Sequence, residues 1–544
     1  MTDQAVPVDN AAVDGAAAAE GAAPVTNYVV RALELFAGYG DQEAIVAEGR
    51  RLSYRDVRNA TLSLAALLYE QGIRAGASVA MLVNDRVESA SLHLALHLLG
   101  CRTVWIATYA PVRDQADFFR LAKADVLIYS VSPRREELAA ELLRRVGPVP
   151  MFCLEPGGRG MDLLTALDGP VPDLDPAWIG PSPESLFYTG GTTGQPKLVH
   201  HDQAFYNMLH MIAAYYLSVN EPPMRFLVGV SFTHVAGQMP AFLTLFEGGT
   251  LFLVEGIDAA DFLNTIERER VTSTFLTPAL LYQVMDDPMA GVADTSSLRY
   301  LNVGGSAASP ARLAQAIEIF GPVIRLVYGS SEAPLITDLP FLDHDPDHPE
   351  RLSSCGRPFA DARIEIRDPA GAPLPVGQTG EVWVSAGLLM NDYWQQPELT
   401  GNTLVDGWLR TGDAGYLDSD GYLFLVGRLN DMIITSLGAA NVYARPIEDV
   451  LASHPEVRAA AVIGVPDEAY GEAVCAYVVR VPGGTVTAAD LRALVEAELN
   501  DLYTPRDIEF VDELPLTPVA KVDKNLLRQR HRESRGTTAP AEHA

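Results

Sequence analysis

The stretch Tyr188-Thr-Gly-Gly-Thr-Thr-Gly-Gln-Pro-Lys197 holds three glycines, three threonines and one lysine within ten residues. Glycines let backbone N–H groups approach a ligand closely, and hydroxyls add further donors. The lysine stands out because only four of the 40 basic residues are lysines, namely Lys123, Lys197, Lys521 and Lys524. We therefore expect that position 197 requires the compact ammonium group of a lysine and not the planar guanidinium of an arginine. The stretch predicts a cradle for phosphate oxygens, formed by Thr189, Gly190, Gly191, Thr192, Thr193, Gly194 and Lys197.

This loop differs from the P-loop pattern, in which a glycine precedes the lysine and a serine or threonine follows it. Here a proline precedes Lys197 and Leu198 follows it. The difference disfavours an ordinary P-loop NTPase, and a glycine-rich turn without a ligand is the competing interpretation.

Composition excludes several classes of protein. A chain of 544 residues is long enough for more than one domain. The net charge of −30 argues against general binding of nucleic acid or an anionic membrane, but not against a small phosphorylated ligand. The four cysteines are too scattered for a zinc site or a disulfide framework. No apolar run is long enough to span a membrane, and the N-terminus lacks a signal-peptide pattern, so we expect a cytoplasmic protein.

The order of predicted elements indicates an α/β fold with two domains. Strand-like runs such as 78–83, 125–129 and 300–303 alternate with helical patterns, which predicts mixed and parallel sheets covered by helices. Shorter strands near 380–384 and 422–426 predict a β-rich subdomain within the large N-terminal domain. The pattern resets after Arg428 and predicts a small α+β C-terminal domain. The expected boundaries are a disordered tail 1–25, a large domain 26–428, a small domain 429–532 and a second disordered tail 533–544.

Four further motifs carry groups suited to a nucleotide. Tyr328 could stack on a base, Ser331 could donate to a phosphate, and Glu332 could hold Mg²⁺ that bridges phosphate oxygens. Asp413, which follows a glycine, could accept both hydroxyls of a ribose. Each motif alone has an ordinary structural explanation: a turn for the tyrosine motif, and a loop or cap residue for Asp413. Arg428 and Lys521 could likewise contact the ligand or lie on the surface, and a solvated tail lysine is the preferred interpretation of Lys524.

Taken in order, these motifs resemble the adenylate-forming superfamily of acyl- and aryl-CoA synthetases, adenylation domains and luciferase-like enzymes. Five motifs agree over most of the chain. Tyr188–Lys197 is similar to the phosphate loop, Tyr328–Glu332 to the YGxTE box, and Asp413 with Arg428 to the ribose-binding pair. Lys521 resembles the adenylation lysine, and the segments 304–308 and 231–237 resemble those lining the adenine and acyl pockets.

The resemblance implies roles for named residues. Lys521 and His234 are the expected catalytic residues, Glu332 the Mg²⁺ ligand and Asn430 the hinge of a mobile small domain. Besides the phosphate loop, the expected nucleotide contacts are Gly305, Ser306, Ala307, Tyr328, Gly329, Ser330, Ser331, Asp413 and Arg428. The expected acid pocket contains His234, Phe232, Val235, Met239, Gly304 and Leu335.

The implied reaction has two steps, with ATP, Mg²⁺ and, as acceptor, CoA. A carboxylate attacks the α-phosphate of ATP, and the acyl-adenylate then reacts with a thiol. An aliphatic, aromatic or arylpropenoic acid is the expected substrate, because no carboxyl-anchoring Asp/Lys pair stands out in residues 230–240.

Departures from the family pattern leave the acceptor open. Gly190 lacks a usual hydroxyl, Ala520 replaces a usual glycine before Lys521, and Asn430 replaces a charged hinge residue. The segment between Ile434 and Asn441, which would border the thiol tunnel, is about two residues longer than usual. A carrier-protein thiol, an amine or nitrite activated for diazotisation therefore remain alternatives to CoA, and a non-catalytic binding relative is a third hypothesis. The oligomeric state is not predicted.

Overall fold

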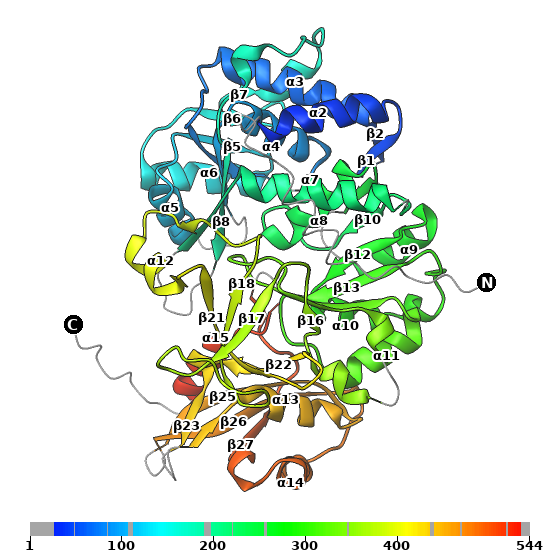
Figure 1. Ribbon diagram of the computed structural model, residues 1–544, viewed down its shortest axis with the longest axis vertical. Helices are drawn as coiled ribbons and strands as arrows, with labels where there is room; N and C mark the ends of the chain where they lie inside the picture. The colour runs from blue at the N-terminus through cyan, green and yellow to red at the C-terminus, as the bar shows by residue number, and fades with distance from the viewer. Residues whose placement is uncertain are drawn as a thin grey trace.

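The computed structural model describes residues 27–534 except 48, 84, 107–111, 190–196, 220, 255–257, 345–347, 436–439, 468–470 and 518–520 (Figure 1). The expected tail 1–25 and most of the tail 533–544 lie outside these residues. Among the described residues, no helix is long and apolar enough to cross a membrane.

Two large sheets form the N-terminal part, as the alternating pattern predicted. The eight-stranded sheet has the order β19 (Asp392–Tyr393), β9 (Lys197–Asp202), β8 (Glu184–Thr189), β4 (Arg102–Trp105), β3 (Ser78–Leu82), β5 (Val126–Tyr129), β6 (Met151–Cys153) and β7 (Met161–Asp162). Strands β3 to β8 pair in parallel, whereas β9 is antiparallel to both β8 and β19.

The nine-stranded sheet has the order β16 (Arg357–Pro358), β15 (Thr337–Leu339), β14 (Ile324–Tyr328), β13 (Tyr300–Gly304), β12 (Ser273–Leu276), β10 (Arg225–Val228), β11 (Thr250–Leu253), β1 (Glu43–Ala47) and β2 (Arg50–Ser53). The strands from β14 to β1 pair in parallel, and the strands at both edges are antiparallel. Their carboxyl ends therefore meet along one edge, where α/β sheets generally bind ligands.

Helices cover both faces of these sheets. The largest hydrophobic core contains residues of α2 (Tyr28–Tyr39), α3 (Tyr54–Glu70), α4 (Val87–Leu98), α7 (Gln203–Ser218) and α8 (Val235–Phe246). A second core joins α9 (Ala259–Glu269), α10 (Pro278–Met285) and α11 (Pro310–Phe320) to the opposite face of the nine-stranded sheet. The helices α5 (Val112–Leu121) and α6 (Pro133–Val146) pack on the eight-stranded sheet. Every residue of α4 is buried, including the polar residues Glu88, Ser89, Ser91, His93 and His97.

The predicted β-rich subdomain is a five-stranded antiparallel sheet. It contains β17 (Arg363–Arg367), β18 (Gly380–Ser385), β20 (Leu404–Val405), β21 (Trp408–Leu417) and β22 (Leu423–Arg428), with α12 (Pro397–Thr403) beside it. Short 3-10 helices connect elements at Leu163–Leu167, Pro176–Trp178, Pro288–Gly291, Phe341–Asp343, Pro349–Ser353 and Asp501–Tyr503.

The small C-terminal domain follows the 3-10 helix η6 (Leu429–Asp431). Its sheet contains β23 (Ile433–Thr435), β24 (Ala440–Val442), β25 (Val457–Asp467), β26 (Gly471–Arg480) and β27 (Asp507–Phe510), with helices α13 (Ala444–Ser453), α14 (Ala488–Glu498) and α15 (Lys524–Ser534). It contacts the large domain through Arg445, which donates to the Ser353 carbonyl at 3.3 Å, and through an Arg458–Asp286 ion pair at 3.0 Å.

Helix α15 corrects two expectations. It continues to Ser534, beyond the expected domain boundary at 532, and the preferred interpretation of Lys524 as a solvated lysine was wrong. Lys524 Nζ lies 2.7 Å from Glu448, and Arg528 binds Asp431 at 2.8 Å. Ion pairs with the small domain therefore hold a helix whose sequence appeared to be a polar tail.

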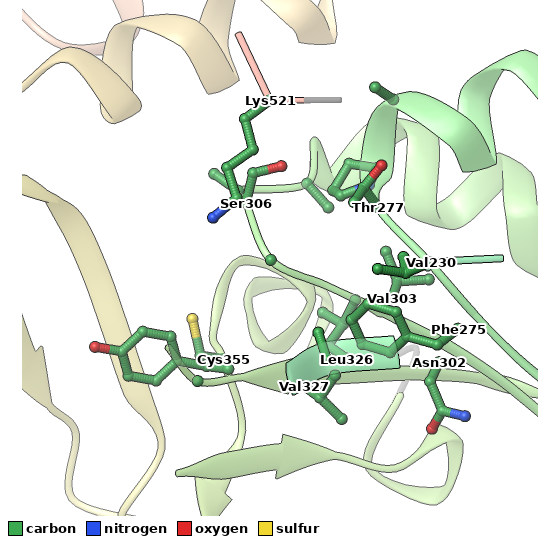
Figure 2. Close-up of a pocket in the computed structure, with 18 of the residues that line it drawn as sticks. Val230, Phe275, Thr277, Asn302, Val303, Ser306, Leu326, Val327, Cys355 and Lys521 are labelled. Atoms are coloured by element: carbon green, nitrogen blue, oxygen red, sulfur yellow. The ribbon is translucent and has the colours of Figure 1, made fainter. Parts of the chain in front are cut away.

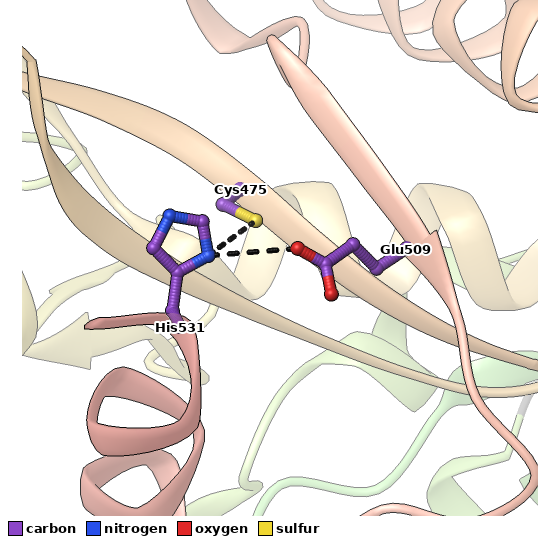
Figure 3. Close-up of side chains that lie close together, drawn as sticks. All are labelled: Cys475, Glu509 and His531. Carbon is purple, nitrogen blue, oxygen red and sulfur yellow. Dashed lines mark hydrogen bonds and ion pairs between the residues drawn. The ribbon is translucent and has the colours of Figure 1, made fainter. Parts of the chain in front are cut away.

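Buried His531 attaches the end of α15 to strand β26. Its Nδ1 lies 3.0 Å from the Tyr477 hydroxyl, 3.9 Å from the Cys475 sulfur and 3.6 Å from Glu509 (Figure 3). Because the tyrosine hydroxyl already bonds this nitrogen, the cluster is explained as a packing contact between α15 and the sheet.

Candidate active site

A cavity of about 1260 Å³ lies between the carboxyl edge of the nine-stranded sheet, helices α7 and α8, and the small domain. It brings together most of the residues singled out in the sequence. Those lining it are Thr189, His234, Val235, Met239, Gly305, Ser306, Ala307, Tyr328, Gly329, Ser330, Ser331, Glu332, Leu335, Asp413, Arg428 and Lys521. They come from both domains and are up to several hundred positions apart in the sequence.

One group in the cavity centres on the carboxylate of Asp413. Asp413 on β21 and Arg428 on β22 are direct partners in the antiparallel register, which places their side chains together. One Asp413 oxygen accepts from Arg428 Nε at 2.7 Å, and the other accepts from the Tyr328 hydroxyl at 2.6 Å. Asp413 is only 6% exposed, and burial raises its pKa although Arg428 opposes the shift. The three residues form a fixed, hydrogen-bonded unit.

A second group joins Glu332 to the base of the glycine-rich loop. Glu332 Oε1 accepts from the Tyr393 hydroxyl at 2.6 Å, and Lys197 Nζ lies 5.3 Å from the centre of the Tyr393 ring. Burial, with Glu332 as a second cause, raises the pKa of Tyr393. Since Tyr393 occupies one carboxylate oxygen, the other is available as an oxygen ligand of the kind that Mg²⁺ prefers. The sequence reasoning missed Tyr393, which lies more than 60 positions after Glu332.

The ends of the glycine-rich loop are fixed although Gly190, Gly191, Thr192, Thr193 and Gly194 lie outside the described residues. Thr189 and Lys197 are opposite each other in the antiparallel pair β8–β9. His201, on the same strand as Lys197, has its Nε2 2.8 Å from the Ser331 carbonyl. The loop therefore begins and ends beside the segment that contains Ser331 and Glu332.

Lys521 of the small domain reaches the same cavity. A Cβ atom added to Gly305, which has a φ of +85°, would lie 3.9 Å from Lys521 Cε. The lysine opens onto the cavity but has protein on most sides, so burial lowers its pKa; Arg428 acts in the same direction, and Asp413 and Glu332 oppose it. Burial, assisted by the charge of Lys521, also lowers the pKa of His234 to about 4. At neutral pH the imidazole of His234 is therefore neutral, and it lies within the field of Lys521.

Helix α8 forms one wall of the cavity. It begins after its N-cap residue His234, and Val235, Met239 and Leu243 line the cavity at the spacing of one helical face. Figure 2 shows Lys521 and Ser306 at one end of the pocket and Asn302 at the other, with Val230, Phe275 and Val303 between them. An apolar channel thus leads away from the lysine along the strands.

Two residues expected in the acid pocket have other positions. Phe232 is 1% exposed and packs in the hydrophobic core, with its ring 6.0 Å from that of Phe242. It faces the core because Asp85 holds the preceding loop by accepting from the Phe232 N–H at 2.9 Å and from Ser231 at 3.0 Å. Gly304 lies against β14, where a Cβ would be 2.5 Å from the Val327 carbonyl oxygen. A glycine is required there for the close approach of the strands.

The sequence reasoning also missed the polar far end of the channel. Glu221, Glu247, Arg299 and Arg325 line the cavity near the amino ends of β10, β13 and β14. Glu247 is the C-cap of α8 and continues the helical face of Val235, Met239 and Leu243 at the same four-residue spacing. That four-residue spacing is the signal in the sequence that could have identified Glu247.

The proposed hinge residue Asn430 lies in η6, between β22 of the large domain and β23 of the small domain. The neighbouring Asp431 is bound by Arg528 of α15. Most of the unusual turn between Ile434 and Asn441 lies outside the described residues.

Comparison with known proteins identifies the family. The model of the AMP-binding enzyme family matches residues 34–394, and that of the AMP-binding enzyme C-terminal domain matches residues 446–521. The chain belongs to this family. It is an AMP-forming ligase of the adenylate-forming superfamily, as the motif order indicated.

Relatives of this AMP-binding enzyme differ in the acid and the acceptor that their names give. It is 37% identical to a medium/long-chain-fatty-acid–CoA ligase, FadD8, of Mycobacterium tuberculosis, over 86% of this chain and 83% of that protein. A feruloyl-CoA synthase of Amycolatopsis is 33% identical over 89% of this chain and 94% of its own. The solved amide bond synthetase McbA of Marinactinospora thermotolerans is 38% identical, with a TM-score of 0.83, and the match covers 92% of this chain and 99% of McbA.

Proposed function

We propose that this ligase adenylates a carboxylic acid with an elongated, largely apolar body and transfers the acyl group to the thiol of CoA. The observation that carries the proposal is the single cavity that joins Lys521 and the Asp413–Arg428–Tyr328 unit to the apolar face of α8. A nucleotide and an acid could occupy its two parts at once, with their reacting groups near Lys521.

The nucleotide would use the groups already fixed in the cavity. Asp413 would accept the ribose hydroxyls, because its oxygens are oriented by Arg428 and Tyr328 and a carboxylate accepts more than two hydrogen bonds. The triphosphate would lie against the glycine-rich loop and Lys197. Glu332 would hold Mg²⁺ through the oxygen that Tyr393 leaves available, and the metal would neutralise phosphate charge.

Lys521 would stabilise the charge that develops during adenylation. A carboxylate oxygen of the acid forms a bond to the α-phosphorus, the bond between the α- and β-phosphates breaks, and pyrophosphate leaves. A cation between the carboxylate and the α-phosphate reduces their repulsion and favours the in-line arrangement. In the second step a thiolate attacks the acyl carbonyl and AMP leaves.

The acid pocket and two relatives support an apolar acid. Val230, Phe275 and Met239 line the channel beyond Lys521 and offer hydrocarbon surface. The relatives named for fatty acids and for feruloyl-CoA would each require a channel of this kind. Neutral His234 would border the carboxylate end without adding charge.

A second candidate keeps the adenylation step and replaces CoA by an amine. The similarity to the amide bond synthetase, at 38% identity over nearly the full length of that protein, favours it. An amine would attack the same acyl carbonyl, form an amide and release AMP.

The test is pyrophosphate release by the full chain with ATP, Mg²⁺ and a panel of acids, repeated without acceptor, with CoA, with aryl and alkyl amines, and with nitrite plus an aryl amine. Products are identified by mass spectrometry. The proposal expects a CoA-dependent thioester. An amide formed equally well without CoA would replace the first proposal by the second, and absence of pyrophosphate release with every acid would overturn both.

A further inference from the structure

The far end of the channel contains a carboxylate whose charge is not balanced by a bound partner. Glu247 is 4% exposed and lines the cavity, so its charge is not solvated at the outer surface of the protein. Its Oε1 accepts from the Met224 N–H at 2.7 Å, which ties the end of α8 to the start of β10. Among the described residues, no hydrogen-bond donor or cation is recorded on its second oxygen. A buried carboxylate oxygen without a donor is costly, because burial removes its hydrogen bonds to water.

The other charges at this end are paired with one another. Arg299 binds Glu221 at 2.7 Å and donates to the Pro222 carbonyl at 2.9 Å. Arg325 binds Asp338 through two nitrogens, at 2.9 and 2.6 Å. Among the described residues at this end, each arginine is thus paired with its own carboxylate, and no ion pair is formed by Glu247. A ligand that brings a hydrogen-bond donor, above all a cationic one, would complete the site.

Glu247 has few neighbours that could supply such a donor. The ionisable groups that influence its charge are Glu221 and Arg299, and Glu247 in turn acts on Tyr39, Tyr54 and Tyr216. The hydroxyls of Tyr39 and Tyr54 already donate to the carbonyls of Phe246 and Gly249, at 2.8 and 2.6 Å. Burial raises the pKa of Glu247 to about 7, and Arg299 only partly opposes this shift. Near neutral pH the group is therefore partly protonated, and a cationic donor on a ligand would stabilise its charged form.

The position of Glu247 relative to the reacting groups sets the size of the ligand. His234 and Glu247 flank helix α8 at its two ends, and thirteen residue steps of about 1.5 Å separate them by roughly 20 Å. The intervening wall is apolar, with Met239 and Leu243 facing the cavity. An acid whose carboxylate lies near Lys521 would reach Glu247 only if its body spans most of this length.

We infer that Glu247 selects acids that carry a hydrogen-bond donor, amino or hydroxyl, at the end remote from the carboxylate. This inference rests on the proposed function, since it names the class of acid that the adenylation site would accept. Glu247 acts as a specificity-determining residue: it does not touch the reacting atoms. Its charged form also disfavours acids that end in a second carboxylate.

The test uses linear acids of about 12 to 16 carbons with a terminal amino, hydroxyl or methyl group, because an extended chain rises about 1.2 Å per bond and roughly 16 bonds span the distance. For the chain length that gives the highest rate, kcat/KM for pyrophosphate release is measured with each terminal group. We expect the donor-terminated acids to exceed the methyl-terminated acid by about 10- to 100-fold. Calorimetric binding of the same acids to the full chain, without ATP, should show the same order.

Two variants assign the preference to the carboxylate. Glu247→Gln keeps an oxygen that can accept from the Met224 N–H. It should reduce the preference for the amino-terminated acid over the methyl-terminated acid by about 10-fold. The preference for the hydroxyl-terminated acid over the methyl-terminated acid should fall by less. Glu247→Leu should favour the methyl-terminated acid. The exposed Glu318→Gln on α11 is the matched control and should leave all ratios unchanged.

Each outcome decides one claim. If the methyl-terminated acid is as good a substrate as the others in the wild-type chain, or if Glu247→Leu leaves the ratio unchanged, the inference is overturned while adenylation stands. If no acid releases pyrophosphate, the proposed function fails, and the calorimetric order still tests the inference.

Discussion

The two ends of the cavity differ in how their carboxylates are satisfied. At the nucleotide end, Asp413 is bound by Arg428 and Tyr328, and Glu332 is bound by Tyr393. At the far end, Glu247 accepts from one backbone N–H, and within the described part of the chain its second oxygen has no hydrogen-bond donor. The first end is organised by the protein before any ligand arrives. The second end depends on the ligand to complete it. We therefore expect the nucleotide end to determine the adenylation reaction and the far end to determine which acid is accepted.

The largest expected effect is at Lys521. Replacing it by alanine should reduce adenylate formation by about 100- to 1000-fold, because one donor to the transition-state charge is lost. Stopped-flow or radiolabelled pyrophosphate exchange measures this step. Reaction of a synthetic acyl-adenylate with CoA should change by only a few-fold. Lys524→Ala, which breaks the ion pair with Glu448, is the nearby control and should retain adenylation. Equal losses in the two variants would contradict the assignment.

The next effect is at Asp413. The Asp413→Asn variant keeps the size of the side chain but removes the charge that Arg428 binds, and we expect kcat/KM for ATP to fall by about 10- to 100-fold. The preference among acids should stay the same, since Asp413 belongs to the opposite end. A steady-state analysis at varied ATP and fixed acid measures both. The control is Asp420→Asn, an exposed residue of the turn before β22. A changed acid preference would show that the two ends are not independent.

A smaller effect is expected from obstructing the channel between the two ends. Met239→Trp adds bulk to the wall of α8 that faces the cavity, and it should lower kcat/KM for long acids by about 10-fold. Short acids and ATP should be little affected, because they would bind closer to Lys521. Ile319→Trp, at an exposed position of α11, controls for added bulk alone. If short and long acids lose activity equally, the long axis of the acid does not follow α8.

The last prediction concerns stability and not activity: Glu247 should make the free energy of unfolding depend on pH. Its pKa rises from a usual value near 4.5 to about 7 in the folded chain, so the folded chain binds this proton more tightly than the unfolded chain does. The wild-type chain should therefore lose stability relative to Glu247→Gln as pH rises from 4.5 to 7, by about 3 kcal/mol. Thermal unfolding midpoints of both variants, measured between pH 4.5 and 8, provide the check. Midpoints that keep a constant difference would mean that Glu247 is not buried as an acid.

The sequence predicted the parallel sheets, the β-rich subdomain and the small domain, because these depend on local periodicity and on the order of elements. It also selected residues that meet in one cavity, since Tyr328, Asp413 and Lys521 stand in short motifs with recognisable neighbours. The roles of these residues and the boundary at 428 stay predictions.

Features that depend on long-range packing were not visible in the sequence. Phe232 and Val235 lie three positions apart, yet only the fold determines that one enters the core and the other faces the cavity. Tyr393 reaches Glu332 because β19 pairs with β9, a contact between strands almost 200 positions apart. Helix α15 has a strongly polar sequence, and the ion pairs that hold it involve residues from distant parts of the domain.

Helix α15 has a consequence for exchanging domains between relatives. The match to the C-terminal family model ends at residue 521, but Lys524, Arg528 and His531 of the following helix bind η6, α13 and β26. A chimera cut at 521 would separate Lys521 from the helix that follows it and is bound to the small domain. A chimera that preserves activity should therefore include the C-terminal domain through Ser534. Its acceptor specificity should be measured only when helix α15 is present.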